Sequence, residues 1–475
     1  MMCLRTGRVK GPEVELTRVD MAKPGLGTTT LLLCCLTGPL WPQAPATEYP
    51  AAVAHVQQGR FRAAIPLLEK LLAQTPADLK ARNLLGIALM SSGRRTDASV
   101  QFHKALAINP RFHPALKNLA INELAMGRNK DAKAHFEQAA QLVPKDAVVH
   151  FHLGQIYFIE QRYGEAAAHF DAAQNGFPDP YQAGYNLLLA RVRNQDYAAA
   201  IRGGEQLTQG HRKAELYNLL ARAYAQSGRT QQAYDALRTA TQIDARDESN
   251  YIELMLLCLE HENWDLSLEI SGIALQIIPQ SYKVRLQRGA VFALKGQLED
   301  AESEFLAATR AAPDINLPHV ALALVRIEQN KLTEAIQGLR ERRIANPKDY
   351  QVNWILAEAI SQEGPEQGSA AEKEAFLALE DAVRANPGAA QPRALLANFL
   401  VKRSDLVRAT REFETALKLD PNDAAAAYQL ALLYQKTGNT RLAGEFFAKV
   451  AKARAEDPAR SAPRNLVRII REGSQ

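Results

Sequence analysis

The side chains best suited to chemistry in this 475-residue chain are its ten histidines. Imidazole nitrogens bind zinc and carry protons near neutral pH. His150 and His152 are close in sequence, but on a helix they would point in different directions. His135 and His169 are 34 residues apart, at one phase of a repeat, and we expect both to point outward. The histidines therefore predict no metal site.

The motifs of the common catalytic sites are missing. The sequence contains no GxxxxGK phosphate loop, no HExxH, no GxSxG and no CxxC pair. Three of the four cysteines lie within the first 35 residues, so Cys258 has no partner for a disulfide in the remainder. The net charge is +5, and basic residues are interspersed with acidic ones. These features predict no enzyme activity, no cofactor and no nucleic-acid partner.

The first 46 residues have the layout of a secretory leader. Lys23 gives a positive start, residues 28–37 are largely apolar, and Ala44-Pro45-Ala46 presents small residues to a signal peptidase. The apolar stretch is much shorter than the roughly 20 residues that cross a bilayer. Acidic residues precede Met21, so we expect Met21 to be the true start of a leader within 1–46.

This leader predicts an exported protein that is periplasmic or associated with the bacterial cell envelope. Two alternatives stay open. Cys34-Cys35 suggests a lipoprotein, although Leu33 stands where such signals usually have a small residue. In the second alternative, the leader is not cleaved and stays as an N-terminal membrane anchor. No other stretch of the chain is apolar enough to span a membrane.

Beyond the leader, the same residue types return every 34 residues. Proline marks the period at Thr75-Pro76, Asn109-Pro110, Val143-Pro144 and Phe177-Pro178. Between the prolines, a leucine followed by a small residue recurs, then a glycine, then an alanine, an aromatic residue and an alanine spaced by four and three. The glycine ends one helix without a Cβ penalty, and the last three residues form an apolar stripe on a second helix.

This order of Leu-Gly, Gly, Ala, Phe, Ala and Pro resembles the tetratricopeptide repeat (TPR), a helix-turn-helix unit of 34 residues. The resemblance implies an all-α fold, an α-solenoid that winds as a right-handed superhelix. It covers about 12 units, which the phase of the pattern places at 45–78, 79–112, 113–146, 147–180, 181–213, 214–247, 248–281, 282–315, 316–349, 350–389, 390–423 and 424–457.

The units differ in regularity. Residues 45–180 hold four regular units, and 214–457 hold units 6 to 12, with an insertion at 365–370. Residues 458–475 carry apolar side chains at helical spacing with arginines between them. We expect them to form a C-terminal capping helix that packs on the last unit, since repeat arrays need a polar-faced cap.

Unit 5 at 181–213 is degenerate. Gly203 and Gly204 fall inside its second helix, with Gly204 at the aromatic position, and the closing proline is missing. Each glycine costs a helix about 1 kcal/mol relative to alanine. This composition suggests a hinge between two halves of the array, although a merely degenerate repeat has the same signature.

The resemblance also implies where a partner binds. In the family, the first helices line the concave face, and the fifth and ninth residues of each unit commonly point into it. An exposed apolar strip of this kind marks a protein-binding surface. The alternative is that these side chains pack between neighbouring first helices. The expected groove residues are Asn83, Lys117, Phe151, Tyr185, Asn218, Arg222, Ile252, Leu286, Trp354 and Tyr428.

The predicted function is therefore a non-catalytic scaffold that binds proteins or peptide segments along the groove. The expected assembly is a monomer or part of a hetero-complex. A second hypothesis is an accessory or regulatory subunit of an envelope enzyme, or of a complex for polysaccharide export or glycosyl transfer. Both hypotheses leave the chain without catalytic or metal-binding residues of its own.

Overall fold

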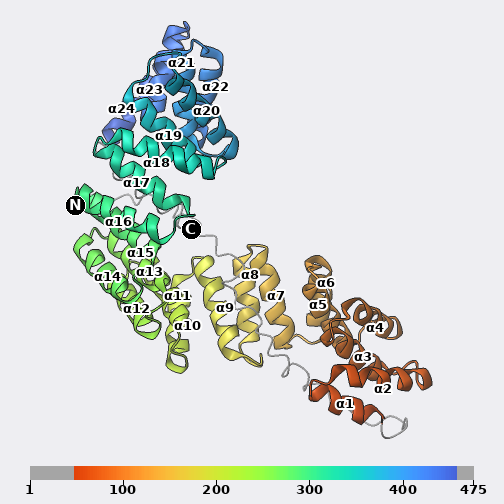
Figure 1. The fold of residues 1–475 in the computed structure, drawn as a ribbon. Coiled ribbons are helices and arrows are strands. Elements are labelled where there is room, and N and C mark those ends of the chain that lie inside the picture. Colours follow the sequence, from red (N-terminus) through yellow and green to blue (C-terminus); the bar gives the residue numbers. More distant parts are fainter. Residues whose placement is uncertain (1–47, 457–475) are drawn as a thin grey trace, which may run out of the picture. The chain divides into compact units, whose positions relative to one another are not determined.

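The computed structural model describes residues 48–456, with side chains up to residue 451. Within this range the chain forms 24 α-helices and no strand (Figure 1). The prediction of an all-α array of about 12 helix-turn-helix units is confirmed. The expected leader at 1–46 and capping helix at 458–475 lie outside the described residues.

The two helices of each unit follow one another directly along the chain. They are α1 (Glu48–Gln57), α2 (Phe61–Gln74), α3 (Leu79–Ser91), α4 (Arg95–Ile108), α5 (His113–Ala125), α6 (Asn129–Leu142), α7 (Ala147–Ile159), α8 (Tyr163–Ala173), α9 (Pro180–Arg193), α10 (Tyr197–Gly210), α11 (Ala214–Gln226), α12 (Thr230–Ile243), α13 (Glu248–Glu260), α14 (Trp264–Ile277), α15 (Tyr282–Leu294), α16 (Leu298–Ala311), α17 (Asn316–Glu328), α18 (Leu332–Ala345), α19 (Tyr350–Glu363), α20 (Ala370–Ala385), α21 (Ala390–Lys402), α22 (Leu406–Leu419), α23 (Ala424–Lys436) and α24 (Thr440–Glu456).

The turn inside every described unit has one residue in the left-handed conformation, always at the same position. Its φ lies between 55° and 88° in all twelve described units, and the residue is glycine in seven of them. The other five are Gln161, Gln195, Glu262, Asn330 and Ser404. Side chains with a Cβ rarely adopt this conformation. The packing of the helix pair therefore imposes the turn even where the residue disfavours it.

The turn between units is set by a different residue. An aspartate or serine just before seven of the first helices accepts hydrogen bonds from backbone N–H groups of the first turn. Asp146, for example, accepts from Val148 and Val149 at 3.0 and 3.2 Å. Such caps satisfy donors that the helix itself leaves open. Proline follows the second helix in every unit except units 5 and 6, and at seven boundaries this cap starts the next helix.

In the regular units, a small residue of the first helix packs against a large residue of the second helix. The eighth residue of the first helix is small and lies under a large residue of the second helix. A Cβ added to Gly86 would lie 2.4 Å from Cε1 of Phe102, and one on Gly289 would lie 2.5 Å from the same atom of Phe305. Phe102 and Phe305 are both fully buried. The helices can approach closely because one partner has no side chain.

Units 5 and 7 reverse the order of large and small residues at these two positions. In unit 5, Leu188 is the large residue of the first helix and Gly204 is the small residue of the second. In unit 7, Met255 on α13 takes the large role and Ser271 on α14 the small one, and both are buried. α10 continues unbroken through Gly203 and Gly204. The degenerate composition of unit 5 is thus an exchange of side-chain volume between two helices.

The insertion in unit 10 is only partly a loop. α19 has 14 residues and α20 has 16, which is longer than most of their counterparts, and six residues, 364–369, join them. Ala370, expected in the insertion, is already the first residue of α20. Ser369 caps α20 at Glu372 N, and the Gln367 amide donates a hydrogen bond to the Lys402 carbonyl at 2.9 Å. These bonds attach the connection to both of the helices beside it.

The contacts divide the described chain into two bodies, 48–243 and 244–456. Unit 5, for which the sequence left both a hinge and a merely degenerate repeat open, lies inside the first body, and the division falls between α12 and α13. Within each body, several pairs of successive first helices touch, such as α3 with α5, α9 with α11 and α17 with α19. In the described part, successive second helices make no comparable contacts. The first helices therefore form the inner, more closely spaced row of each body.

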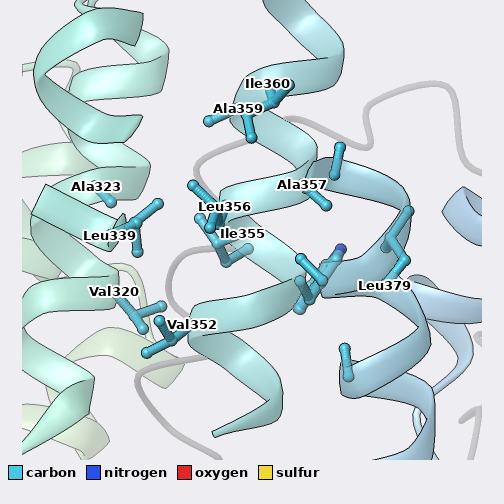
Figure 2. Packing of buried hydrophobic residues seen from close by; sticks show 14 of the residues in the cluster. Val320, Ala323, Leu339, Val352, Ile355, Leu356, Ala357, Ala359, Ile360 and Leu379 are labelled. Carbon is cyan, nitrogen blue, oxygen red and sulfur yellow. The ribbon is translucent and has the colours of Figure 1, made fainter. Parts of the chain in front are cut away.

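The core of the second body shows how this row is built. Figure 2 shows Val320 of α17 facing Val352 of α19, and Leu379 of α20 facing Ala357 of α19. These side chains are completely buried. Burying a valine or leucine stabilises a fold by about 1.5–3 kcal/mol. One face of α19 is thus used for the neighbouring unit and another for its own second helix.

Candidate binding surface on the first helices

The structure separates the predicted groove residues into two groups. Phe151 and Leu286 are 1% and 0% exposed, and Trp354 is 8% exposed. Phe151 stacks on Phe177, with ring centroids 3.9 Å apart, and meets Phe170 edge to face. For these three side chains the packing alternative holds, because they present almost no surface to a partner.

The remaining predicted residues keep part of their surface on the inner row. Tyr428 is 37% exposed. The half-buried residues are Asn83, Lys117, Tyr185, Asn218, Arg222 and Ile252. The structure therefore brings polar side chains together in the first body, whereas Ile252 and Tyr428 belong to the second.

In the first body, the inner row is polar and largely paired. The Asn118 amide donates to Asn83 Oδ1 at 3.0 Å. Lys117 Nζ lies 2.7 Å from Asp146 Oδ2, and the same carboxylate lies 3.3 Å from Nε2 of His113. Lys117 is therefore neutralised by an aspartate that also caps the next first helix.

The pKa of Asp146 follows from these contacts. Burial opposes its ionisation, but the hydrogen bond from Lys117 and the charge of that ammonium group outweigh burial. The pKa of Asp146 is lowered as a result. The carboxylate stays charged and holds Lys117 in place at neutral pH.

Two polar side chains farther along the row, His152 and Asn186, are neutral. His152 Nδ1 is hydrogen-bonded to Gln155 Oε1 at 2.9 Å, and its ring stacks on Phe136. Burial lowers the pKa of His152, so the ring is uncharged at neutral pH. Asn186 is 1% exposed, and neither of its amide atoms has a partner in the described structure. Besides the cations Lys117 and Arg222, the partly exposed side chains of this row therefore include the amides of Asn83 and Asn118 and the uncharged imidazole of His152.

Asn118, His152 and Asn186 were not among the predicted site residues. All three occupy the sixth position of their units, beside the predicted fifth position. The signal that could have found them is their common repeat phase in units 3, 4 and 5. A polar residue recurring at one phase of an otherwise apolar helix indicates a shared environment.

In the second body, the inner row is more apolar. Its half-buried residues include Ile252, Leu256 and Leu324, one or two to a first helix. Glu358 interrupts this apolar run at the ninth position of α19. Burial, and after it the charge of Glu328, raises the pKa of Glu358. No ion pair to either carboxylate is found in the described part of the chain.

The outward histidines of the sequence prediction turn back toward their own units. His135 Nδ1 lies 2.8 Å from Glu123 Oε2 on α5, which raises the pKa of His135. His169 Nδ1 lies 2.9 Å from His150 Nδ1 on α7. Among the described residues, no three His, Cys, Asp or Glu side chains are grouped as a metal site requires. The two pairs hold second helices to first helices.

We predict that the pKa of His169 lies far below the pKa of His135. Burial, and then the charge of His150, lowers the pKa of His169 to about 4. Because the folded state disfavours its protonated form, the contribution of His169 to stability is complete above about pH 6.5. That contribution is lost as the pH falls toward 4. An NMR titration of the imidazole signals measures both pKa values.

The matched variant is His150→Ala, in which the pKa of His169 is expected to rise part of the way toward 6.5 while that of His135 stays. Equal titration of His135 and His169 near pH 6.5 in the unmodified chain would contradict the packing described for both pairs.

Comparisons with known proteins agree with the repeat architecture. Three family models, each described as tetratricopeptide repeat, match residues 55–120 and 400–462, residues 117–183, and residues 214–247. The chain thus contains tetratricopeptide repeats in both bodies. No catalytic family is among these matches, and no curated protein matches the sequence.

Two solved structures match this chain over most of its length. The crystal structure of yeast Tom70 is 16% identical over 90% of this chain and 95% of its own, with a TM-score of 0.43. The Cut9 and Hcn1 hetero-tetramer of APC/C gives 13% identity, 90% and 96% coverage, and a TM-score of 0.41. Within residues 48–456, no helix is both long and apolar enough to cross a membrane.

Proposed function

We propose that this array of tetratricopeptide repeats is a non-catalytic scaffold that holds segments of partner proteins along its first helices. The observation that carries the proposal is the inner row of first helices. It combines a closely packed backbone with partly exposed side chains at the same repeat phase, from Asn83 to Tyr428. Within each body, such a row presents a surface to an extended or helical segment.

The two bodies suit different parts of a partner. The amides and neutral imidazole of the first body match the hydrogen-bonding groups of a peptide backbone. The half-buried apolar residues of the second body match apolar side chains. We propose that partner segments engage the first body through polar contacts and the second through apolar ones.

The proposed location is the bacterial periplasm or cell envelope. The composition of residues 21–46 supports export, and Cys258 is buried as a free thiol. A fusion of residues 1–60 to a reporter that is active only after export tests this proposal. Activity that is lost when Leu31 to Leu33 become charged supports export. A reporter inactive with the intact leader contradicts it.

Photo-crosslinking tests the binding surface. A photoreactive phenylalanine analogue placed at Tyr185 or Leu324 on the inner row is expected to capture the same partner protein from an envelope extract. The same residue at Val100 or Ile344 is the matched control, because these side chains are 45% and 84% exposed on second helices. Capture from the second helices alone would reject the proposed surface.

We predict that Tyr185→Ala weakens binding of the captured partner about tenfold, since truncating an aromatic contact residue commonly costs 1–2 kcal/mol of binding. Because Tyr185 is only half-buried, we expect thermal stability to change little. Titration of the purified partner measures the affinity, and circular dichroism measures the melting temperature. Unchanged affinity with a large stability loss would show that Tyr185 serves packing alone.

A further inference from the structure

The shortest of the described second helices is α8, in the first body. It has 11 residues, whereas each of the other described second helices has 14 or more. The chain leaves α8 through Asn175 and Gly176, which are both exposed, and the φ of Gly176 is 117°. A residue with a Cβ rarely adopts a φ in this range. The early end of α8 thus coincides with the only Asn-Gly pair in the sequence.

The backbone nitrogen of Gly176 is well placed to react. Within residues 48–456 its N–H group donates no hydrogen bond, whereas the N–H group of Phe177 donates to the Ala173 carbonyl at 3.2 Å. The space beside Gly176 is open, because only Cβ of Ala147, at 3.4 Å, would lie within 4 Å of an added Cβ. A nucleophile that has no steric hindrance and no competing hydrogen bond reaches its target more easily.

We propose that Asn175 is a site of spontaneous deamidation. The nitrogen of Gly176 attacks Cγ of Asn175, and the C–N bond of the side-chain amide breaks. Ammonia leaves with the proton of the Gly176 N–H group, and a cyclic succinimide remains. Water then opens this ring at either carbonyl, which gives aspartate or isoaspartate. The isoaspartate product has one more carbon atom in its main chain, a lengthening of about 1.5 Å.

This lengthening acts on a ring contact two residues away. Phe177 is 8% exposed and stacks on Phe151 of α7, with ring centroids 3.9 Å apart. The chain beyond Phe177 is fixed, because Pro178 is rigid and Asp179 caps α9 through the N–H group of Gln182 at 2.9 Å. Phe177 therefore has to move. A gap of about 0.5–1 Å already forfeits a quarter to a half of a van der Waals contact.

Conversion to isoaspartate therefore loosens the cover of Phe151. Phe151 has the repeat phase of the inner row but is 1% exposed, because the ring of Phe177 lies on it. As the protein ages, a buried residue of the inner row thus becomes one that a partner segment can reach. The effect on partner binding rests on the proposed function, whereas the reaction and the loosening do not.

Peptide mapping of the full chain tests the reaction. After incubation at mildly alkaline pH, mass spectrometry is expected to find aspartate and isoaspartate at position 175. Asn194 is the internal control, because it is also exposed and precedes a residue of positive φ, Gln195 at 61°. Gln195 has a Cβ, however, and its N–H group donates to the Val192 carbonyl at 3.1 Å.

Conversion at Asn194 is expected to be about 100-fold slower than at Asn175, since a misplaced nucleophile commonly costs this factor in rate. Equally slow conversion of the two asparagines overturns the proposal. The variant Asn175→Gln is expected to stay unconverted under the same conditions, and this variant supplies an aged sample without the modification.

Hydrogen exchange tests the loosening. The isoaspartate form is isolated chromatographically from the aged chain and compared with Asn175→Asp, which has the added charge but the normal backbone. The Phe177 amide is expected to exchange about tenfold faster in the isoaspartate form than in Asn175→Asp or in the fresh chain. Unchanged exchange in the isoaspartate form, or an equal increase in Asn175→Asp, overturns the loosening.

Failure of this inference and failure of the scaffold function are observed separately, because mapping and hydrogen exchange need no partner. If neither the aged chain nor aged Asn175→Gln captures a partner at Tyr185, the scaffold function is rejected and the deamidation stands. Where capture succeeds, the affinities of these two samples are expected to differ by about fivefold, the effect of one aromatic contact. Equal affinities overturn the effect on binding.

Discussion

Replacing Gly204 with phenylalanine is expected to destabilise the chain severely, by more than about 3 kcal/mol. At this position the other regular units place a phenylalanine or leucine, so the substitution would restore the usual repeat pattern. In this unit, however, Leu188 and Leu220 occupy the space. A Cβ on Gly204 would already lie 2.8 Å from Cδ1 of Leu220 and 3.4 Å from Cδ2 of Leu188. Denaturant unfolding measures the loss.

Two further variants separate overpacking from helix propensity. Gly204→Ala adds one methyl group against flexible side-chain ends and gains up to about 1 kcal/mol of helix propensity, so we expect a small net change. Leu188→Gly/Gly204→Phe returns the unit to the usual arrangement and is expected to recover part of the stability. If Gly204→Phe alone is tolerated, the reversed contact in unit 5 does not exist in solution.

The same contact predicts the behaviour of the expected hinge. Leu188 is 2% exposed and Gly204 is buried, as in the regular units around them. We therefore expect amide hydrogens of α9 and α10 to exchange as slowly as those of α7 and α8. Faster exchange confined to 181–213 would support the hinge that the sequence suggested.

Replacing Arg403 with alanine is the second change with a large expected effect, about 2–4 kcal/mol. Arg403 follows α21, and its Nε and Nη2 donate to the two carboxylate oxygens of Glu372 at 2.8 and 2.9 Å. Its guanidinium also lies 3.7 Å from the ring centroid of Phe376. The Glu372 side chain is 5% exposed, so the substitution leaves a buried carboxylate without its cation. Denaturant unfolding measures this change too.

The matched control is Arg408→Ala. Arg408 pairs with Glu380 at 3.0 Å, but its side chain is 47% exposed, and such pairs contribute at most about 1 kcal/mol. Adding Glu372→Gln to Arg403→Ala is expected to recover stability, because the buried charge is then gone. Similar losses for Arg403→Ala and Arg408→Ala would show that the Glu372 pair is no stronger than a surface pair.

The pH dependence gives an independent check. The hydrogen bond from Arg403 lowers the pKa of Glu372. The pair therefore contributes its full stability above about pH 4.5 and loses it as the pH falls through the lowered pKa. We expect the unmodified chain and Arg403→Ala to differ most near neutral pH and to converge in acid.

The sequence predicted the helix pairs because each boundary has a local cause. Proline ends a second helix, and the left-handed residue ends a first helix even where it is Gln161 or Glu262. The exchange of Leu188 with Gly204 was not predictable in this way. Leu188 stands where the repeat has a small residue, and Gly204 stands where it has a large one. Only their contact in the structure shows that the two changes compensate for each other.

The candidate site was predicted less completely. Repeat phase gives the side of the helix on which a residue lies, and the half-exposed Tyr185 and Tyr428 agree with that phase. It does not give burial, which depends on the neighbouring unit. Phe151 shares their phase, yet Phe177 from the following connection stacks on its ring and covers it.

The reversed contacts in units 5 and 7 also bear on how such an array can change by recombination. A first helix that carries Leu188 or Met255 is compatible only with a second helix that has a glycine or serine opposite it. If α16 replaced α10 as the partner of α9, Phe305 would face Leu188. The space between the two helices holds only one large side chain, so the two would clash. We therefore expect crossovers at the boundaries between units to be tolerated better than crossovers at the turn inside unit 5. The smallest segment that we expect to be exchangeable between units is therefore the whole helix pair, and not a single helix.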